Sequence, residues 1–158
     1  MRLTGQPLYG WINQKRIRML FEACEDHTAL EGGGEMIPVP DGLTVEHALP
    51  QGWREHWPLP DGALDAEQAA EERDARVHRL GNLTLVTQKL NSSMSNAAWQ
   101  VKRGELAKRS QLLVNQRLCA NESWDEALID ERSADLAARI LATWPGPEAA
   151  VWDSPPAG

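Results

Sequence analysis

The hydrophobic positions of the chain follow a helical period in some stretches and a strand period in others. Residues 10–26 carry apolar side chains at intervals of three and four, which predicts a helix with one apolar face. These positions are Ile17, Leu20, Phe21 and Cys24. Residues 43–47 are predicted to form a short strand after the turn Pro40-Asp41-Gly42. Residues 80–87 alternate with the two-residue period of a second strand.

Helices are predicted for most of the second half of the chain. A short helix over residues 88–94 follows the second strand directly. A longer helix, capped by Ser95 or Asn96, is predicted to run to about residue 118. Ser123 and Glu126 have the spacing of a capping box and predict the start of a last helix, which Pro145 stops. One face of this helix repeats every four residues and is apolar except for Arg132. Its positions are Trp124, Leu128, Arg132, Leu136, Ile140 and Trp144.

A long connection, residues 48–79, separates the two predicted strands. Pro58, Pro60 and Asp61-Gly62 interrupt it, and its Ala and Glu content predicts a polar helix over residues 65–76. One hairpin among several helices predicts an α+β fold. A chain of 158 residues is long enough for one core. We expect residues 1–9 to be a tail or linker, residues 10–145 to be the domain, and residues 146–158 to be a flexible C-terminal tail.

Composition narrows the class of protein. Seven Trp residues against one Tyr and one Phe are predicted to serve mainly as core packing. The two cysteines, Cys24 and Cys119, form no CxxC pair, which argues against a zinc knuckle, and Cys24 is predicted to be a core thiol. No apolar run is long enough for a membrane span, and no signal-peptide pattern opens the chain. A cytoplasmic location is therefore expected.

The net charge of −7 conceals a basic segment. Residues 73–117 hold nine Lys or Arg residues and two acidic residues, a local net charge of +7. Such a segment predicts a positive face that binds phosphate. The alternative is a solvated helix face without a partner. The candidate DNA contacts are Lys89, Lys102, Arg103, Lys108 and Arg109.

The candidate chemistry lies around the predicted strands. Glu46-His47 is followed by Pro50, Gly81-Asn82-Leu83 opens the second strand, and Asn91 lies nine residues after Asn82. This set resembles the HNH, or His-Me finger (ββα-metal), endonuclease superfamily. More narrowly, it resembles the C-terminal nuclease domain of GmrSD-type, modification-dependent restriction enzymes. The narrower resemblance covers roughly residues 10–145, including Lys102, Asn115, Trp124, Arg132 and Trp144. It implies a ββα-metal core of hairpin and helix, surrounded by longer helices.

The resemblance also implies a role for each site residue. Glu46 binds the metal, and His47 is the general base that faces the attacking water. Asn82 holds the loop and orients the histidine. Asn91 supplies an amide oxygen to the cation, at a position where many HNH members have His. Lys102 is expected to contact phosphate, whereas Arg132 lies in an apolar stripe that favours a buried network.

The residue types themselves suit phosphodiester hydrolysis. That reaction needs a base for water, a hard cation for the phosphoryl charge, and stabilisation of the leaving 3′ oxygen. Histidine has a suitable pKa, and oxygen donors favour Mg²⁺ or Mn²⁺ over zinc. Adjacent strand residues point to opposite faces, so Glu46 and His47 can serve one site only if the strand ends or twists there.

Structural roles compete with these functional roles. A strand histidine often packs in a core, Asn91 suits a helix N-cap, and Asn82 suits a turn. For the other histidines we expect structural roles, although His78 lies directly before the second strand and within reach of a substrate there. These residues are His27, His56 and His78.

Together these features predict a metal-dependent DNA endonuclease that nicks double-stranded DNA, modified DNA included, and leaves a 5′ phosphate and a 3′ hydroxyl. The resemblance further implies a bacterial defence system and, as partner, an N-terminal nucleotide-hydrolysing or sensor domain of a longer protein. One alternative is a DNA-binding module whose HNH-like site no longer cuts, with salt-sensitive binding that needs no metal. Another is an interaction domain with an exposed tryptophan patch.

Overall fold

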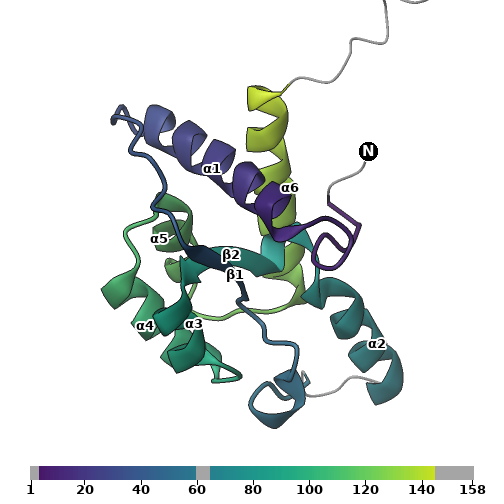
Figure 1. Ribbon diagram of the computed structural model, residues 1–158. Coiled ribbons are helices and arrows are strands. Elements are labelled where there is room, and N and C mark those ends of the chain that lie inside the picture. The colour runs from purple at the N-terminus through teal and green to yellow at the C-terminus, as the bar shows by residue number, and fades with distance from the viewer. Residues whose placement is uncertain (1–3, 60–64, 145–158) are drawn as a thin grey trace, which may run out of the picture.

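The computed structural model describes residues 4–59 and 65–144, in which helices surround one two-stranded antiparallel sheet (Figure 1). This arrangement confirms the predicted α+β class. The elements are α1 (Gln14–Glu31), β1 (Leu43–His47), η1 (Trp53–Glu55), α2 (Ala66–Val77), η2 (Leu80–Asn82), β2 (Leu83–Thr87), α3 (Gln88–Met94), α4 (Trp99–Arg109), α5 (Leu113–Cys119) and α6 (Glu126–Thr143).

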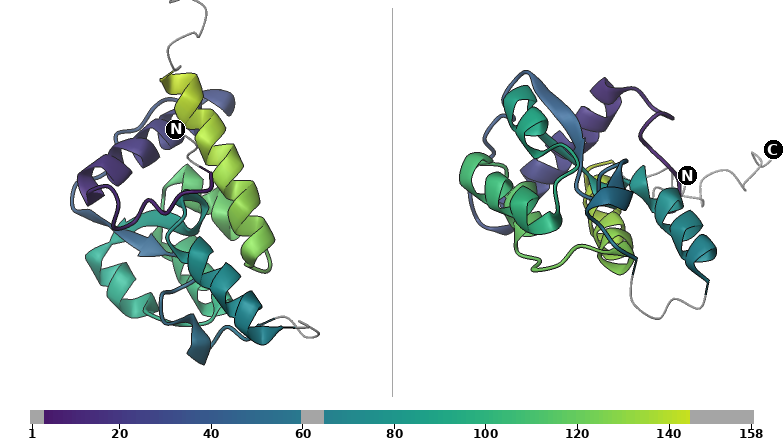
Figure 2. Two further views of the ribbon diagram at one scale, coloured as in Figure 1. Left: turned by 90° about the vertical axis from the view of Figure 1, so that its right-hand side faces the viewer. Right: turned by 90° about the horizontal axis from the view of Figure 1, so that it is seen from below.

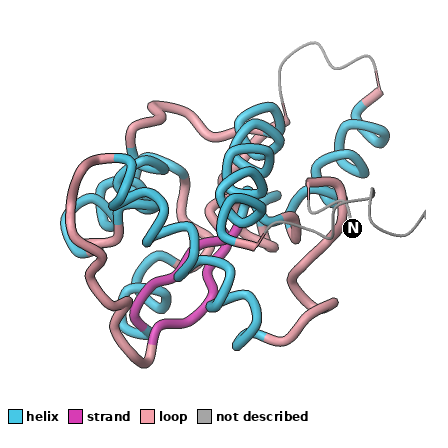
Figure 3. The backbone as a smooth tube through the Cα atoms, turned by 90° about the horizontal axis from the view of Figure 1, so that it is seen from above, coloured by secondary structure: helices cyan, strands magenta, loops and turns pink. Residues whose placement is uncertain are grey.

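The two strands and α3 form one hairpin-plus-helix unit. β1 and β2 pair from Leu43 opposite Thr87 to His47 opposite Leu83. The chain turns directly from β2 into α3, because the hydroxyl of Thr87 accepts a hydrogen bond from Leu90 N at 3.2 Å and caps the helix. Figure 3 shows the strands side by side between the helices.

Each face of the hairpin packs against a different group of helices. Val45, Leu83 and Leu85 point to one core, which includes side chains of α1 and α6. Val86 and Leu90 point to the other core, which α4, α5 and the start of α6 complete. Figure 2 shows α6 crossing α1 on one side of the molecule. The short sheet is therefore buried on both faces, and its alternating side chains reach two separate environments.

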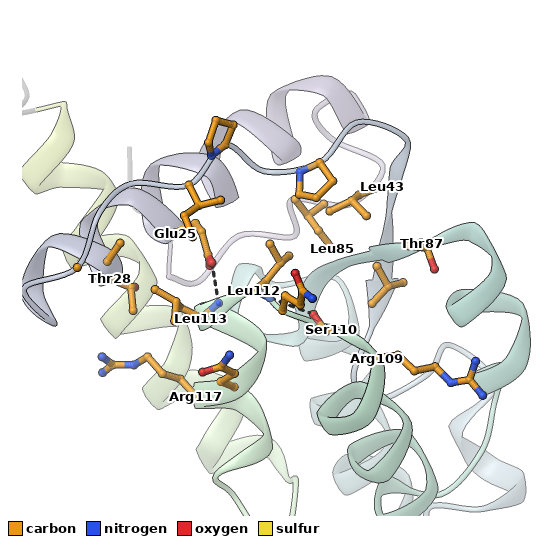
Figure 4. A pocket seen from close by; sticks show the side chains of 18 of the residues that line it. Glu25, Thr28, Leu43, Leu85, Thr87, Arg109, Ser110, Leu112, Leu113 and Arg117 are labelled. Carbon is orange, nitrogen blue, oxygen red and sulfur yellow. Dashed lines mark hydrogen bonds between the residues drawn. The ribbon is translucent and has the colours of Figure 1, made fainter.

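Two helix boundaries differ from the sequence prediction. The helix predicted over residues 10–26 runs from Gln14 to Glu31, where the Gly32 cap ends it. The long helix predicted from Ser95 or Asn96 to residue 118 is wrong, because the chain forms two helices. The carboxylate of Glu25 in α1 accepts hydrogen bonds from Leu113 N at 2.6 Å and Val114 N at 3.0 Å (Figure 4). A distant acid thus caps α5 and fixes the break.

The start of α6 also differs in detail. Asp125, rather than Ser123, caps the helix, since its carboxylate accepts a hydrogen bond from Leu128 N at 2.9 Å. The helix is described to Thr143, and Pro145, its predicted stop, lies outside the described residues. None of the described helices is long and apolar enough to cross a membrane.

The N-terminal segment belongs to the packed domain from residue 7 onward. Leu8 is fully buried, and Leu8 N and Tyr9 N donate hydrogen bonds to His78 O at 2.7 and 3.2 Å. Pro7 forms a bridge with Arg79. The expected tail over residues 1–9 is therefore too long at its C-terminal side. The expected C-terminal tail, residues 146–158, lies outside the described residues.

Four tryptophans confirm the prediction of core packing: Trp53, Trp57, Trp99 and Trp124 are buried. Trp11 and Trp144 are exposed instead. Cys24 is fully buried, as predicted, and burial raises the pKa of its thiol to about 12. It is consequently a packing residue rather than a nucleophile.

Candidate active site

The last two residues of β1, Glu46 and His47, flank the end of the strand. Both are buried and pair across the hairpin with Thr84 and Leu83. Their side chains leave the strand on opposite faces, as its geometry requires. Glu46 meets Lys102 of α4, and His47 meets the N-terminal segment and the end of α2. β1 ends directly after His47, so the two side chains lie on either side of one strand end.

Asn82 holds the chain that follows His47. Its Oδ1 accepts hydrogen bonds from Leu49 N at 2.8 Å and Trp124 Nε1 at 3.1 Å. Its Nδ2 donates to Leu49 O and Val77 O, each at 2.8 Å. The fully buried amide therefore uses all four of its hydrogen-bonding positions inside the protein. These bonds suit the orienting role expected for Asn82 and leave its amide none for a substrate.

Helix α6 holds the residues on both sides of Asn82. Ser133 Oγ accepts a hydrogen bond from Gly81 N at 2.9 Å. Arg132 Nη1 donates to Gly81 O at 2.6 Å and Leu83 O at 2.7 Å. Burial lowers the pKa of Arg132 to about 10, so the guanidinium stays charged at neutral pH. Arg132 thus belongs to the buried network that its position in the apolar stripe suggested.

The ring of His47 lies against two further rings. His47 Nε2 is 3.2 Å from His78 Nδ1. Tyr9 presents its edge to His47, with ring centroids 4.6 Å apart. Burial, and after it the neighbouring His78 and Lys102, lower the pKa of His47 to about 3. The imidazole is therefore neutral at neutral pH, and a pKa this low makes it a weaker base than an ordinary histidine.

His78 and Tyr9 were not among the site residues predicted from sequence. His78 caps the C-terminus of α2 and was expected to be structural, and Tyr9 fell in the expected tail. The one signal in the sequence for a role of His78 was its position three residues before the Gly81-Asn82 motif. Their approach to His47 depends on how α2 and the N-terminal segment pack, which no local pattern reports.

On the other face of β1, Lys102 is an internal ion-pair partner. Its fully buried ammonium donates hydrogen bonds to Glu46 Oε1 and His47 O, both at 2.6 Å. Burial lowers the pKa of Lys102, and the Glu46 carboxylate opposes that shift. The prediction that Lys102 contacts DNA phosphate is wrong for this structure, because the side chain has no exposed surface. It holds the Glu46 side chain and the main chain of His47 together.

Asn91 lies on the Glu46 face of the hairpin. Its Nδ2 donates to Thr44 Oγ1 at 3.2 Å and Val45 O at 3.4 Å. Thr44 and Glu46 are two residues apart in the strand and share that face. Asn91 does not cap α3, since Thr87 does, so the N-cap alternative for Asn91 is excluded.

A side-chain oxygen can bind a metal ion only if no hydrogen bond already occupies it, so the candidate ligand atoms of Glu46 and Asn91 are their oxygens without a hydrogen-bond partner. Within residues 4–59 and 65–144, the fully enclosed side-chain atoms that lack a partner are Arg79 Nε and Arg132 Nη2. Glu46 Oε2, Asn91 Oδ1 and His47 Nδ1 also have no hydrogen-bond partner among these residues. None of these three atoms is among the fully enclosed ones, although His47 and Glu46 as residues are buried.

Two of those atoms are oxygens on one face of the hairpin, Glu46 Oε2 and Asn91 Oδ1. Mg²⁺ is commonly held by one or two carboxylates with water and substrate phosphate as the remaining ligands. In the part of the chain that the structure describes, no three His, Cys, Asp or Glu side chains gather as a metal site. The donors fit a hard cation that keeps water and phosphate ligands, and they do not resemble a closed zinc site.

Replacing Lys102 by methionine is expected to lower the free energy of unfolding by about 3 kcal/mol, because Glu46 would stay buried without its partner. Urea denaturation of the parent and variant chains measures this. Lys108→Met, at an exposed position of the same helix, is the matched control and should change stability by less than about 0.5 kcal/mol. Unchanged stability with weakened DNA binding would instead support the phosphate contact.

The predicted basic face is smaller in the structure than in the sequence. Of the nine basic residues in 73–117, six pair with carboxylates: Arg73, Arg76, Arg79, Lys102, Arg109 and Arg117. Most of their partners lie outside the segment, on α6, α1 and β1, so the local charge of +7 is largely compensated. Arg103 is half-buried and donates to Cys119 O at 2.7 Å. The predicted DNA contacts that remain exposed are Lys89, Lys108 and Arg109.

A groove of about 840 Å³ lies between the end of α1, the hairpin and the α4–α5 junction, away from Glu46 and His47. Figure 4 shows Leu43, Leu85 and Leu112 in it, with Arg109 and Arg117 at its rim. Neither Glu46 nor His47 lines this groove. The candidate chemistry is therefore at the strand end rather than in the groove.

The fold and the site together define a class of protein: a small α+β domain with a hairpin and a short helix, with a histidine on one face of the strand end and a carboxylate on the other. Comparison of the sequence with known protein families identifies the family. Residues 3–139 match the family described as GmrSD restriction endonucleases, C-terminal domain, and the chain belongs to that family. The family is one of restriction nucleases, which act on DNA. No curated protein and no solved structure matched the chain.

Proposed function

We propose that this domain is an HNH-type, metal-dependent endonuclease in which His47 is the general base. The observation that supports this proposal best is the position of His47 at the end of β1. Its ring lies at the end of β1, its Nδ1 has no hydrogen-bond partner among the described residues, and the Asn82 amide holds the chain that follows it. A general base needs a fixed position and a lone pair without another partner, and these contacts support both for His47.

In the proposed reaction, His47 Nδ1 takes a proton from a water molecule, so that one O–H bond breaks and one N–H bond forms. The resulting hydroxide attacks phosphorus in line. The bond from phosphorus to the 3′ oxygen breaks, and that oxygen takes a proton from solvent. The products carry a 5′ phosphate and a 3′ hydroxyl. Mg²⁺ or Mn²⁺ held by Glu46 and Asn91 would neutralise charge on the phosphoryl oxygens and the leaving oxygen.

The substrate would be held by the exposed basic side chains. Lys89 follows β2 in α3, and Lys108 and Arg109 end α4. Because one such domain has one base, we propose that it nicks one strand and that double-strand cleavage needs two copies. Modified DNA as the target, a bacterial defence role and an N-terminal nucleotide-hydrolysing or sensor domain as partner remain part of the proposal.

Cleavage of supercoiled plasmid is expected to require Mg²⁺ or Mn²⁺ and to stop in EDTA. Asn91→Ala should need at least about tenfold more Mg²⁺ for half-maximal rate, because it removes one of two oxygen ligands. Ser92→Ala is the matched control, since Ser92 is exposed and its hydroxyl donates to Gln88 O of its own helix.

Equal cleavage in EDTA would contradict the metal requirement. If the parent chain binds DNA in a salt-sensitive way but never cuts, the alternative of an inactive DNA-binding module would be supported instead.

A further inference from the structure

The His47 ring has one neighbour whose role is unassigned, the ring of His78. His47 comes from the end of β1, and His78 comes from the C-cap of α2, which is 31 residues further along the chain. Their rings are nearly perpendicular, with centroids 5.2 Å apart and an interplanar angle of 77°. Nε2 of His47 is 3.2 Å from Nδ1 of His78, which is hydrogen-bond distance between two ring nitrogens.

The N-terminal segment holds His78 in this position. The backbone carbonyl of His78 accepts hydrogen bonds from Leu8 N at 2.7 Å and Tyr9 N at 3.2 Å. The ring of Tyr9 stacks on the ring of His78, with centroids 5.7 Å apart and planes 14° apart. The same ring presents its edge to His47. Main chain and side chain of His78 are therefore both fixed, and Leu8 anchors the segment in the core.

One proton lies between the two histidines, and its position decides what His47 can do. A neutral imidazole carries a single N–H, and its other nitrogen carries the lone pair. If His78 donated to His47 Nε2, the proton of neutral His47 would be on Nδ1, the nitrogen without a hydrogen-bond partner among the described residues. If His47 donates through Nε2, its Nδ1 carries the lone pair. Only the second arrangement makes Nδ1 a base, and it requires an acceptor at His78 Nδ1.

We propose that His78 is a positioning residue for His47: its Nδ1 accepts the Nε2–H proton and fixes His47 in the tautomer whose Nδ1 is free. His78 then carries its own proton on Nε2. This inference rests on the proposed function, because the tautomer of His47 affects catalysis only if His47 is the general base. When His47 Nδ1 takes the proton from water, the hydrogen bond to His78 stays in place and stabilises the imidazolium. No proton needs to pass to His78.

Two substitutions of His78 distinguish its role as a hydrogen-bond acceptor from its role as a packed ring. His78→Asn places an amide oxygen near the present position of Nδ1 but removes the stacked ring. His78→Phe keeps a ring beside Tyr9 but removes the acceptor. If His78 positions His47, the Phe variant should lower kcat on supercoiled plasmid by roughly 10–100-fold with little change in KM. The Asn variant should recover most of that loss. The opposite order, an active Phe variant and an inactive Asn variant, would overturn the proposal in favour of packing.

A second readout does not depend on nuclease activity. Long-range ¹H–¹⁵N correlation spectra of the imidazole nitrogens report the tautomer of His47 directly. The parent chain and His78→Asn should show the Nε2–H tautomer, and His78→Phe should lose it. An unchanged His47 tautomer in His78→Phe would overturn the inference even if the domain cuts DNA. The expected tautomers in a chain that cuts no DNA would support the inference while the proposed nuclease function failed.

Discussion

A chain with alanine in place of His47 is expected to nick supercoiled plasmid at least about 100-fold more slowly than the parent chain. The imidazole lies at the strand end, and its Nδ1 has no hydrogen-bond partner among the described residues. Alanine removes the acceptor for the proton of water and leaves the exposed Lys89, Lys108 and Arg109 in place. The affinity for DNA, measured by fluorescence anisotropy at fixed salt, should therefore change little.

The matched control for this result is His56→Ala. His56 is exposed in the long connection and lies 3.6 Å from the carboxylate of its neighbour Glu55. The hydrogen bonds that hold the strand end do not involve it, so its removal should leave the nicking rate unchanged. Parent-like cleavage by His47→Ala would exclude His47 as the base. Equal losses in both variants would point to a general effect on folding.

Gly81→Ala is expected to prevent stable folding, with a loss above about 4 kcal/mol in the free energy of unfolding. A Cβ atom at Gly81 would lie 2.0 Å from Ile129 O and 2.4 Å from Ser133 Oγ. The first of these is a backbone atom of α6, so no side-chain rotation removes the clash. Moving α6 away would break the bonds from Arg132 and Ser133 to the chain around Asn82.

Gly104→Ala is the corresponding control, because a Cβ there meets nothing within 4 Å. Gly104 lies inside α4, where alanine should stabilise the helix by roughly 0.5–1 kcal/mol. Thermal unfolding followed by circular dichroism compares both variants with the parent. A Gly81→Ala chain that unfolds at the parent temperature would show that the close contact with α6 is not required.

The local sequence was sufficient for the elements whose signals are themselves local. Residues 43–47 form β1, and residues 88–94 form α3, both within the predicted bounds. A turn with glycine at positive φ, Gly42, precedes the strand, and the hydroxyl of Thr87 caps the helix. Sequence neighbours supply both signals, so these two elements were predictable before any packing was known. The second strand was predicted over residues 80–87 but begins at Leu83, because Leu80–Asn82 form the turn η2.

The break between α4 and α5 was not predictable in this way. Residues 99–118 contain no proline, and a continuous helix satisfies their local preferences. The cap that starts α5 comes from Glu25, 88 residues before Leu113. Asn115 then holds this region against the sheet, with Nδ2 donating to Leu85 O at 3.0 Å. Tertiary hydrogen bonds therefore decided where the helices end.

For the site, the sequence by itself determined the candidate groups: the pair Glu46 and His47, the orienting Asn82, and Asn91 on the next helix. The tertiary structure decided what each group contacts. It buried Lys102 against Glu46, and it brought His78 and Tyr9 to the ring of His47. The reason is physical. Residue type and strand alternation are properties of neighbouring residues, whereas the partner of a buried charge or ring is set by how distant elements pack.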